Sequence, residues 1–416
     1  MNRRWPVSLF LLLLPPVAPA VAPSCQLDKL PVGEQKLGPW IDKRNWLDIE
    51  NQRLTLQSAT TFMPAWRIAP ATDRTSAPLA SRSLEDLPAV DPLDGKARNL
   101  GFLLDSRLAA DGIVVLRNGQ IVAERYRNGL LHDRPRPLLE ATRPLLNLLG
   151  AISISQGKLA ADKSVSRYIP TFAASASLRK ISIQRLLDDN EHRAWSPEEI
   201  ATWRQAGGWT EGGADKGVRT WIAQPNRWDR PLAGPDTGAE ATPEDDLLAW
   251  VLTESNGRPL ARLFCEQLLL PARPEHEALW LSDAEGVELA NGLALSPRDF
   301  AKLGQLLVEA RGNRKRTRIP TWFIETLLAS SGIRAGDIKG LAKGSELRYG
   351  FVHLGGTPNR VALIGTHGTS LYLDFDKRLV IASFASYPQA HTPAMQALLE
   401  QVWHSVERGL KPARTR

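Results

Sequence analysis

The stretch from Leu138 to Leu159 constrains the fold of this chain more than any other. From Pro144 onward, apolar residues recur at helical spacing, which predicts a buried helix. Pro144 stands where the first turn of a helix tolerates proline, and Gly157 is typical of a helix C-terminal stop. We therefore expect the rest of the chain to pack around one buried helix.

Strands are predicted on both sides of this helix. Two apolar runs flank Asn118-Gly119, which is the favoured two-residue turn of a hairpin. Further apolar runs predict strands over 349–352, 360–364, 370–374 and 378–384, and Thr392 is expected to cap a final helix. Because the middle of the chain is mainly helical in pattern, we expect an α/β (α+β) fold in which an antiparallel sheet is flanked by helices and a helical domain is inserted.

The first twenty residues have the organisation of a secretory signal peptide. Arg3 and Arg4 form a basic segment, 7–14 form an apolar segment, and Ala18-Pro19-Ala20 offers a cleavage site. An uncleaved anchor or a lipoprotein at Cys25 are the alternatives. The apolar segment is too short to span a bilayer, so we expect a periplasmic or secreted protein with no stable membrane span after cleavage.

The remaining sequence divides into two parts. Residues 21–98, rich in Pro, Ser and Asp, are expected to be an extension that wraps on the main domain, with disorder as the alternative. Residues 99–410 are expected to form that domain, with its sheet part in about 99–135 and 345–410 and its helical part in about 136–344.

The two cysteines of the chain are Cys25 and Cys265. In an oxidising compartment they could form one long-range disulfide, and two unpaired thiols are the alternative. Sequence alone does not show whether the two residues are close.

Composition excludes several function classes. The 52 basic residues exceed the 45 acidic ones by seven, and only 311–318 is a basic run, which is typical of a solvated loop. Attraction to an anionic envelope surface is a less specific interpretation of this charge. No nucleic-acid motif, phosphate loop or metal-ligand spacing among the seven histidines is found, so we expect no cofactor, metal or nucleic-acid partner.

A second block is as well patterned as the first. Gly286 to Leu307 contains Ser296 as an N-cap, Pro297 in the first turn and an early Asp299. This block, together with the order of the predicted elements over about 99–408, resembles the serine β-lactamase and penicillin-binding-protein superfamily. The likeness is to its class C-like branch, which includes the 6-aminohexanoate-dimer hydrolases.

The resemblance implies that the buried helix opens with Ser-x-x-Lys, where Ser is acylated and Lys helps to deprotonate it. At those positions this chain has Glu140 and Arg143, or Ala141 and Pro144 if the register shifts by one. Neither register supplies a serine or a lysine. The letters Ser-x-x-Lys do occur at Ser177, but they precede a different helix.

The resemblance also implies a Tyr-x-Asn or Tyr-x-Ser motif and a strand motif that lines the pocket. The first of these falls on Glu240 and Thr242, so the tyrosine is replaced. The second falls on the segment 365–369, which retains His367 and Gly368.

Loss of the nucleophile alone lowers turnover by on the order of a millionfold in a serine protease. We therefore expect an exported, catalytically degenerate relative of serine hydrolases, with an active amide or ester hydrolase of atypical site as the alternative. For an active hydrolase, the resemblance implies that the substrate would be a β-lactam, a D-amino-acid peptide or a short linear amide. A peptidoglycan-like or small amide or ester molecule is the expected ligand.

Three interpretations of the replaced residues remain open if Glu140, Arg143, Glu240 and His367 converge. Arg143 could bridge the two glutamates in a structural ion cluster. It could instead bind a ligand carboxylate, with His367 as a further donor. The two glutamates could also perform acid–base chemistry, one carrying a proton and the other activating water.

Overall fold

The computed structural model describes residues 24–70, 78–80, 82–188, 192–212, 217–233, 241–312, 317–329 and 338–410. The predicted signal segment and Glu240, one of the expected site residues, lie outside this part of the chain.

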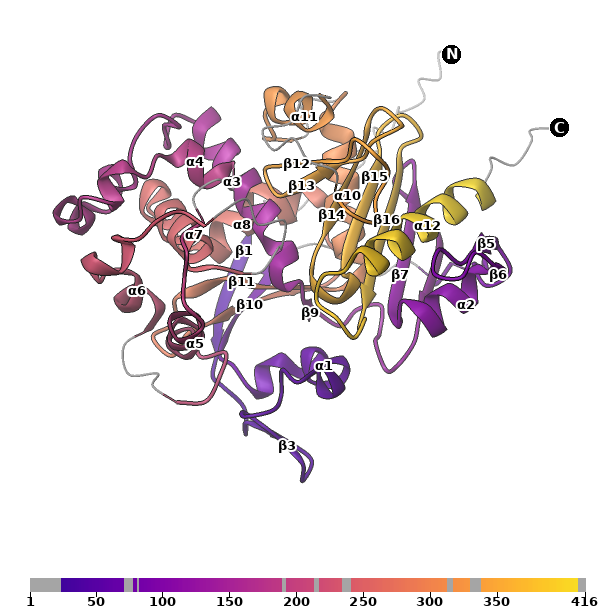
Figure 1. The fold of residues 1–416 in the computed structure, drawn as a ribbon, viewed down its shortest axis with the longest axis horizontal. Coiled ribbons are helices and arrows are strands. Elements are labelled where there is room, and N and C mark those ends of the chain that lie inside the picture. The colour runs from indigo at the N-terminus through magenta and orange to yellow at the C-terminus, as the bar shows by residue number, and fades with distance from the viewer. Residues whose placement is uncertain are drawn as a thin grey trace, which may run out of the picture.

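A seven-stranded antiparallel sheet is built from both halves of the chain, in the order β12-β13-β14-β15-β16-β7-β8 (Figure 1). Its strands are β12 (Glu346–Arg348), β13 (Phe351–His353), β14 (Arg360–Ile364), β15 (Ser370–Asp374), β16 (Leu379–Ala385), β7 (Ala110–Arg117) and β8 (Gln120–Tyr126). The mixed fold with antiparallel sheets that the sequence predicts is thereby confirmed.

Alternate residues of this sheet face two different helices. On one face, α10 (Pro297–Ala310) packs closely, because a Cβ at Gly304 would lie 2.6 Å from Val380 Cγ1. On the other face, α12 (Pro393–Gly409) stacks Trp403 on Tyr372 with ring centroids 5.2 Å apart. The period of two along each strand thus divides the apolar side chains between two cores.

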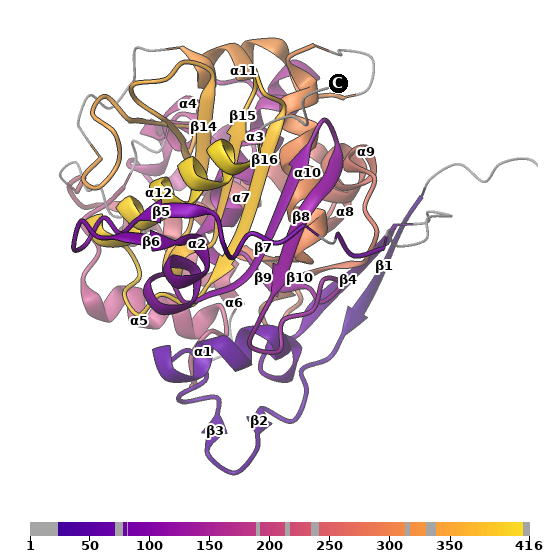
Figure 2. The same ribbon diagram turned by 90° about the vertical axis from the view of Figure 1, so that its right-hand side faces the viewer.

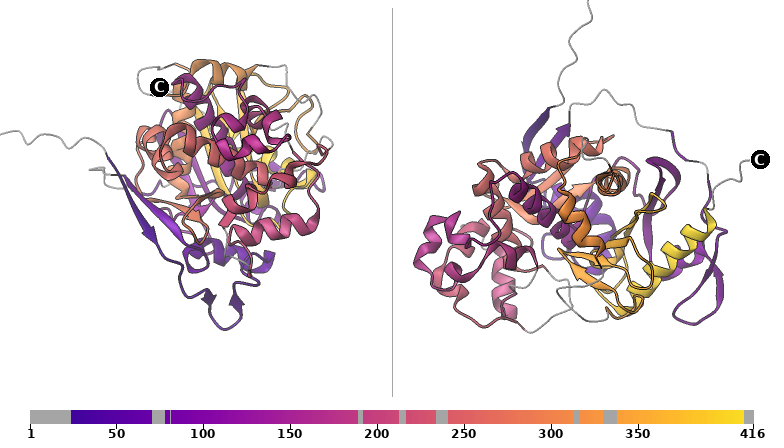
Figure 3. Two further views of the ribbon diagram at one scale, coloured as in Figure 1. Left: turned by 90° about the vertical axis from the view of Figure 1, so that its left-hand side faces the viewer. Right: turned by 90° about the horizontal axis from the view of Figure 1, so that it is seen from above.

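The helices of the inserted part gather beside the sheet (Figure 3). Apart from α10, its longest members are α3 (Arg143–Ser155), α5 (Pro197–Ala206) and α7 (Pro243–Asn256). Shorter segments are η3 (Leu139–Thr142), α4 (Ile183–Leu187), α6 (Gly217–Ile222), α8 (Leu260–Phe264), η9 (Cys265–Leu269), α9 (Leu270–Ala272) and α11 (Thr321–Leu328). None of the helices within the described ranges combines the length and apolar content needed to cross a membrane.

A second, five-stranded sheet joins the N-terminal extension to the inserted part, in the order β1-β4-β10-β11-β9. Its strands are β1 (Cys25–Leu30), β4 (Ala65–Pro70), β10 (Ala278–Ser282), β11 (Glu288–Leu295) and β9 (Arg136–Pro137). Between β1 and β4 the chain forms the hairpin β2 (Lys36–Leu37) and β3 (Ile41–Asp42), then α1 (Ile49–Thr55). The extension is therefore part of a sheet as well as a covering segment.

Cys25 and Cys265 form a disulfide in this structure, with Cα atoms 6.2 Å apart and a sequence separation of 240. Cys25 opens β1, and Cys265 lies at the start of η9. Both residues are buried. The bond thus ties the edge strand of the second sheet to the helical part.

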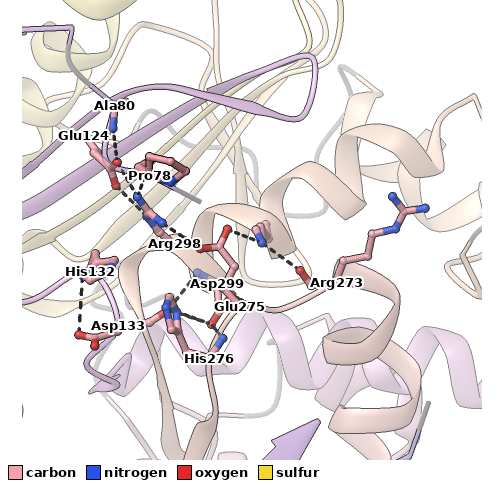
Figure 4. A network of polar contacts seen from close by, with 12 residues as sticks. Pro78, Ala80, Glu124, His132, Asp133, Arg273, Glu275, His276, Arg298 and Asp299 are labelled. Atoms are coloured by element: carbon pink, nitrogen blue, oxygen red, sulfur yellow. Dashed lines mark hydrogen bonds and ion pairs between the residues drawn. The ribbon is translucent and has the colours of Figure 1, made fainter. Parts of the chain in front are cut away.

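A fully buried arginine links the first sheet to the helical part. Arg298 donates to Glu124 Oε1 at 2.7 Å and to Glu275 Oε2 at 2.9 Å, and Lys302 approaches Glu275 Oε1 at 2.7 Å (Figure 4). Ser296 accepts from the amide of Asp299 at 3.1 Å, which confirms the predicted N-cap. The helix start predicted from the sequence therefore positions Arg298 between the carboxylate of Glu124 in β8 and that of Glu275 in the loop before β10.

The disulfide gives a first prediction. Replacing both cysteines, Cys25→Ser with Cys265→Ser, should lower the free energy of unfolding by about 2–4 kcal/mol, because the open chain gains entropy when unfolded. Urea unfolding of the double variant and of the oxidised parent measures this difference. Equal midpoints and slopes would contradict it.

The buried arginine gives a second prediction. Arg298→Ala should cost about 3–5 kcal/mol, because Glu124 and Glu275 would remain buried without their cation. Arg311→Ala is the matched control, since Arg311 pairs with Asp376 on the surface and both side chains are largely exposed. Equal stability losses of the two variants, measured by urea unfolding, would argue against the role of burial.

Candidate functional site

The entry to α3 holds Glu140 in a strained turn. Leu139 has φ = +51°, a left-handed conformation that a leucine rarely adopts. Glu140 follows in η3, and Arg143 and Pro144 begin the helix, as the sequence predicts for Pro144. A carboxyl group therefore lies at the helix start, where the sequence resemblance leads one to expect the nucleophile.

Glu140 is bonded to a hydroxyl from the sheet. Thr366 in η10 (Thr366–Gly368), which follows β14, donates to Glu140 Oε2. The segment approaches η3 so closely that a Cβ at Gly365 would lie 2.8 Å from Ala141 Cβ, which only glycine permits. Burial raises the pKa of Glu140, and the Thr366 hydrogen bond opposes this effect.

Arg143 is paired with Asp245, a residue that no motif in the sequence indicates. Its Nη1 forms an ion pair with Asp245 Oδ1, and its Nη2 donates to the carbonyl of Leu186 at 2.5 Å. Only 8% of the Arg143 side chain and 6% of the Asp245 side chain are exposed. The pair therefore fastens the start of α3 to the start of α7.

Thr242 caps α7 and shares Asp245 with Arg143. The Thr242 amide donates to Asp245 Oδ2 at 3.0 Å in a capping box, and its hydroxyl lies 3.5 Å from His192 Nδ1. Asp245 thus has one oxygen toward the arginine and one toward the helix cap.

Two further buried acids, Glu244 and Asp246, flank Asp245 in the sequence. Glu244 accepts from Trp195 Nε1 at 2.9 Å, and Asp246 accepts from Trp203 Nε1 at 2.9 Å. Burial raises the pKa of Glu244 and raises that of Asp246 to about 7, with the neighbouring Asp245 charge adding to the effect on Asp246. The run of three acids at 244–246, at a helix start where anions are favoured, was the sequence signal for this cluster.

The His367 side chain is directed toward Tyr387, in the segment that follows β16. Its Nδ1 lies 2.7 Å from the carbonyl of Tyr387, so Nδ1 carries the hydrogen, and burial lowers the pKa of the imidazole. Gly368 is buried against Leu108 and Ala385. The structure places His367 beside Thr366, and Thr366 is the residue that contacts Glu140.

Ser177, where the letters Ser-x-x-Lys occur, and Ser153 each have a local hydrogen-bond partner. Ser177 donates to Asp229 Oδ1 at 2.5 Å at an exposed position before η6 (Leu178–Lys180). Ser153 donates to the carbonyl of Leu149 at 2.8 Å inside α3. Among the described residues, no three His, Cys, Asp or Glu side chains are grouped as metal ligands.

Comparison with known proteins finds similarity to proteins of the kind that its motifs resemble. No protein-family model matches the sequence. It is 25% identical over 324 residues to 6-aminohexanoate-dimer hydrolase of Paenarthrobacter ureafaciens, covering 74% of this chain and 79% of that protein.

Solved structures share the fold of this chain. A Bacillus anthracis structure, described as a candidate 6-aminohexanoate-dimer hydrolase, matches with a TM-score of 0.73 and 20% identity over 89% of this chain and 98% of that one. A class C β-lactamase matches with a TM-score of 0.53 and 13% identity over 76% and 94%. The chain therefore has the β-lactamase/transpeptidase fold.

Asp246 gives a third prediction, on pH dependence. Its pKa is raised from 3.8 to about 7 in the folded chain, so the folded state binds more protons than the unfolded state between these values. Stability should therefore fall as pH rises through this window, and Asp246→Asn should flatten that fall. Urea unfolding at a series of pH values measures the slope.

The control for this measurement is Asp376→Asn. Asn359 and Arg311 hold the pKa of Asp376 below its usual value, so this substitution should not flatten the same part of the curve. A pH-independent difference between Asp246→Asn and the parent would contradict the assignment to Asp246.

Proposed function

We propose that this chain, a relative of 6-aminohexanoate-dimer hydrolase with the β-lactamase/transpeptidase fold, is a catalytically degenerate serine-hydrolase homologue that binds a small amide or ester ligand in the cell envelope. The export part of the proposal rests on the N-terminal sequence pattern and agrees with the Cys25–Cys265 disulfide.

The observation that carries the proposal is the Arg143–Asp245 ion pair. A guanidinium stays protonated in proteins and has no lone pair to accept a proton. Arg143 therefore cannot take the role that the superfamily gives to a lysine, and its partner Asp245 holds it away from that role. Glu140 replaces the hydroxyl that would be acylated.

The same residues support binding. The raised pKa of Glu140 favours a protonated carboxyl, which presents one donor and one acceptor. An amide presents the complementary pair of groups, and Thr366 holds the carboxyl in place. A small linear amide, the class of molecule named for the relative from P. ureafaciens, therefore suits this position.

A second candidate function is hydrolysis by acid–base chemistry, and the raised pKa of Glu140 is the observation that favours it. In that case Glu140 would be the proton donor to the leaving group. Water would need activation by another carboxylate, and Asp245 is already committed to Arg143 and the helix cap.

Labelling tests the loss of catalysis. The purified chain should remain unlabelled by a fluorescent penicillin and by a fluorophosphonate under conditions in which a class C β-lactamase is fully labelled. Labelling that Thr366→Val abolishes would reveal a threonine nucleophile and refute the proposal. Labelling at any serine would refute it equally.

Ligand binding tests the retained site. Short linear amides or peptidoglycan fragments should raise the melting temperature without being hydrolysed, and Glu140→Gln should weaken their binding by about tenfold, since one carboxyl hydrogen bond is altered. Ser177→Ala, remote from Glu140 in the sequence and bonded to Asp229, is the matched control. Turnover that depends on Glu140 would instead support the acid–base candidate.

A further inference from the structure

We propose that the hairpin β2–β3 is a docking element that places Trp40 in the surface of an anionic lipid bilayer. The hairpin projects from the body of the molecule below α1 (Figure 2). Its strands pair Lys36 with Asp42 and Leu37 with Ile41, and Gly38-Pro39-Trp40 forms the loop. Trp40 is therefore carried at the tip.

Trp40 is the most exposed large hydrophobic residue in the part of the chain that the structure describes. Its exposed fraction is 85%, whereas Trp322, another partly exposed tryptophan, has 37%. An indole is a large apolar group, and leaving it in water forfeits the free energy that its burial would provide. Contact with a partner surface would therefore stabilise the Trp40 side chain.

The exposure is not the result of a loose loop, because hydrogen bonds brace the hairpin. Asn45 Nδ2 donates to the carbonyl of Trp40 at 2.9 Å, and Asn45 Oδ1 accepts from the amide of Asp42 at 2.9 Å. Lys43 Nζ donates to the carbonyl of Phe62 at 2.8 Å. A braced element loses little conformational entropy on docking, which favours binding.

The base of the hairpin is fixed to the helical part. Trp46 is buried, donates to the carbonyl of Trp209 at 2.9 Å and stacks on Phe62 with ring centroids 5.0 Å apart. The two tryptophans of this region thus have opposite roles, since Trp46 holds the hairpin and Trp40 points its ring into solvent.

Charge and shape favour a bilayer as the occupant. Within 36–44, Arg44 is paired with Asp42 and Lys43 donates to the carbonyl of Phe62, so Lys36 supplies the remaining positive charge of the hairpin. The whole chain has a net charge of +7. A convex tip needs a complementary hollow in a protein partner, whereas a lipid surface adapts to it. Indole rings favour the membrane–water interface, and nearby cations favour anionic lipid.

Vesicle sedimentation tests the proposal. The parent and all variants are produced by the cell in the same way, so that they have the same N-terminus. The parent should sediment with phosphatidylcholine vesicles containing about one third phosphatidylglycerol, and less at about 0.5 M salt than at about 0.05 M salt. Trp40→Ala should lower the bound fraction about five- to tenfold, because a single buried ring supplies much of a weak interfacial attachment.

Trp322→Ala is the matched control, since it removes an exposed indole elsewhere on the surface and should bind as the parent does. Melting temperatures of all three proteins check that folding is unchanged. Equal sedimentation of Trp40→Ala and the parent would overturn the proposal, as would equal binding to vesicles of phosphatidylcholine alone. A dimer that forms without vesicles and disappears in Trp40→Ala would overturn it in favour of a second copy of the chain.

Discussion

The ion pair between Arg143 and Asp245 is the constraint on which the arrangement of the site depends. It joins the starts of two helices that are about a hundred residues apart in the sequence, and both side chains are almost completely buried. A buried arginine without its carboxylate would be strongly destabilising, so the two positions are tied to each other. At this point of the β-lactamase/transpeptidase fold the chain therefore holds a neutralised ion pair.

Those parts of the fold that local patterns encode could be predicted from the sequence. The hairpin at Asn118-Gly119, the C-terminal strands and the Ser296 cap each depend on neighbours within a few residues. The five-stranded sheet could not be predicted, because β1 and β4 pair with each other and β4 then pairs with β10, more than two hundred residues away. Short strands in a Pro- and Ser-rich region carry little pattern of their own.

The candidate site shows the same division. The assignment of Glu140 and Arg143 to the positions of the expected serine and lysine is a prediction from the sequence, because it requires only the register of one helix. The partners Thr366 and Asp245 were not, because each contact joins residues 226 or 102 positions apart and depends on how two elements pack. His367 was identified from the sequence, but the structure turns its Nδ1 to the carbonyl of Tyr387.

The disulfide has a consequence for the order in which the molecule is completed. Cys265 is synthesised 240 residues after Cys25, so the disulfide that anchors β1 cannot form until well over half of the chain has been made. Until then β1 is held by its pairing with β4, which includes the Asp28–Arg67 ion pair. The covalent anchoring of β1, the edge strand of the five-stranded sheet, is therefore a late event. In a compartment that keeps thiols reduced, β1 would be able to detach from this sheet.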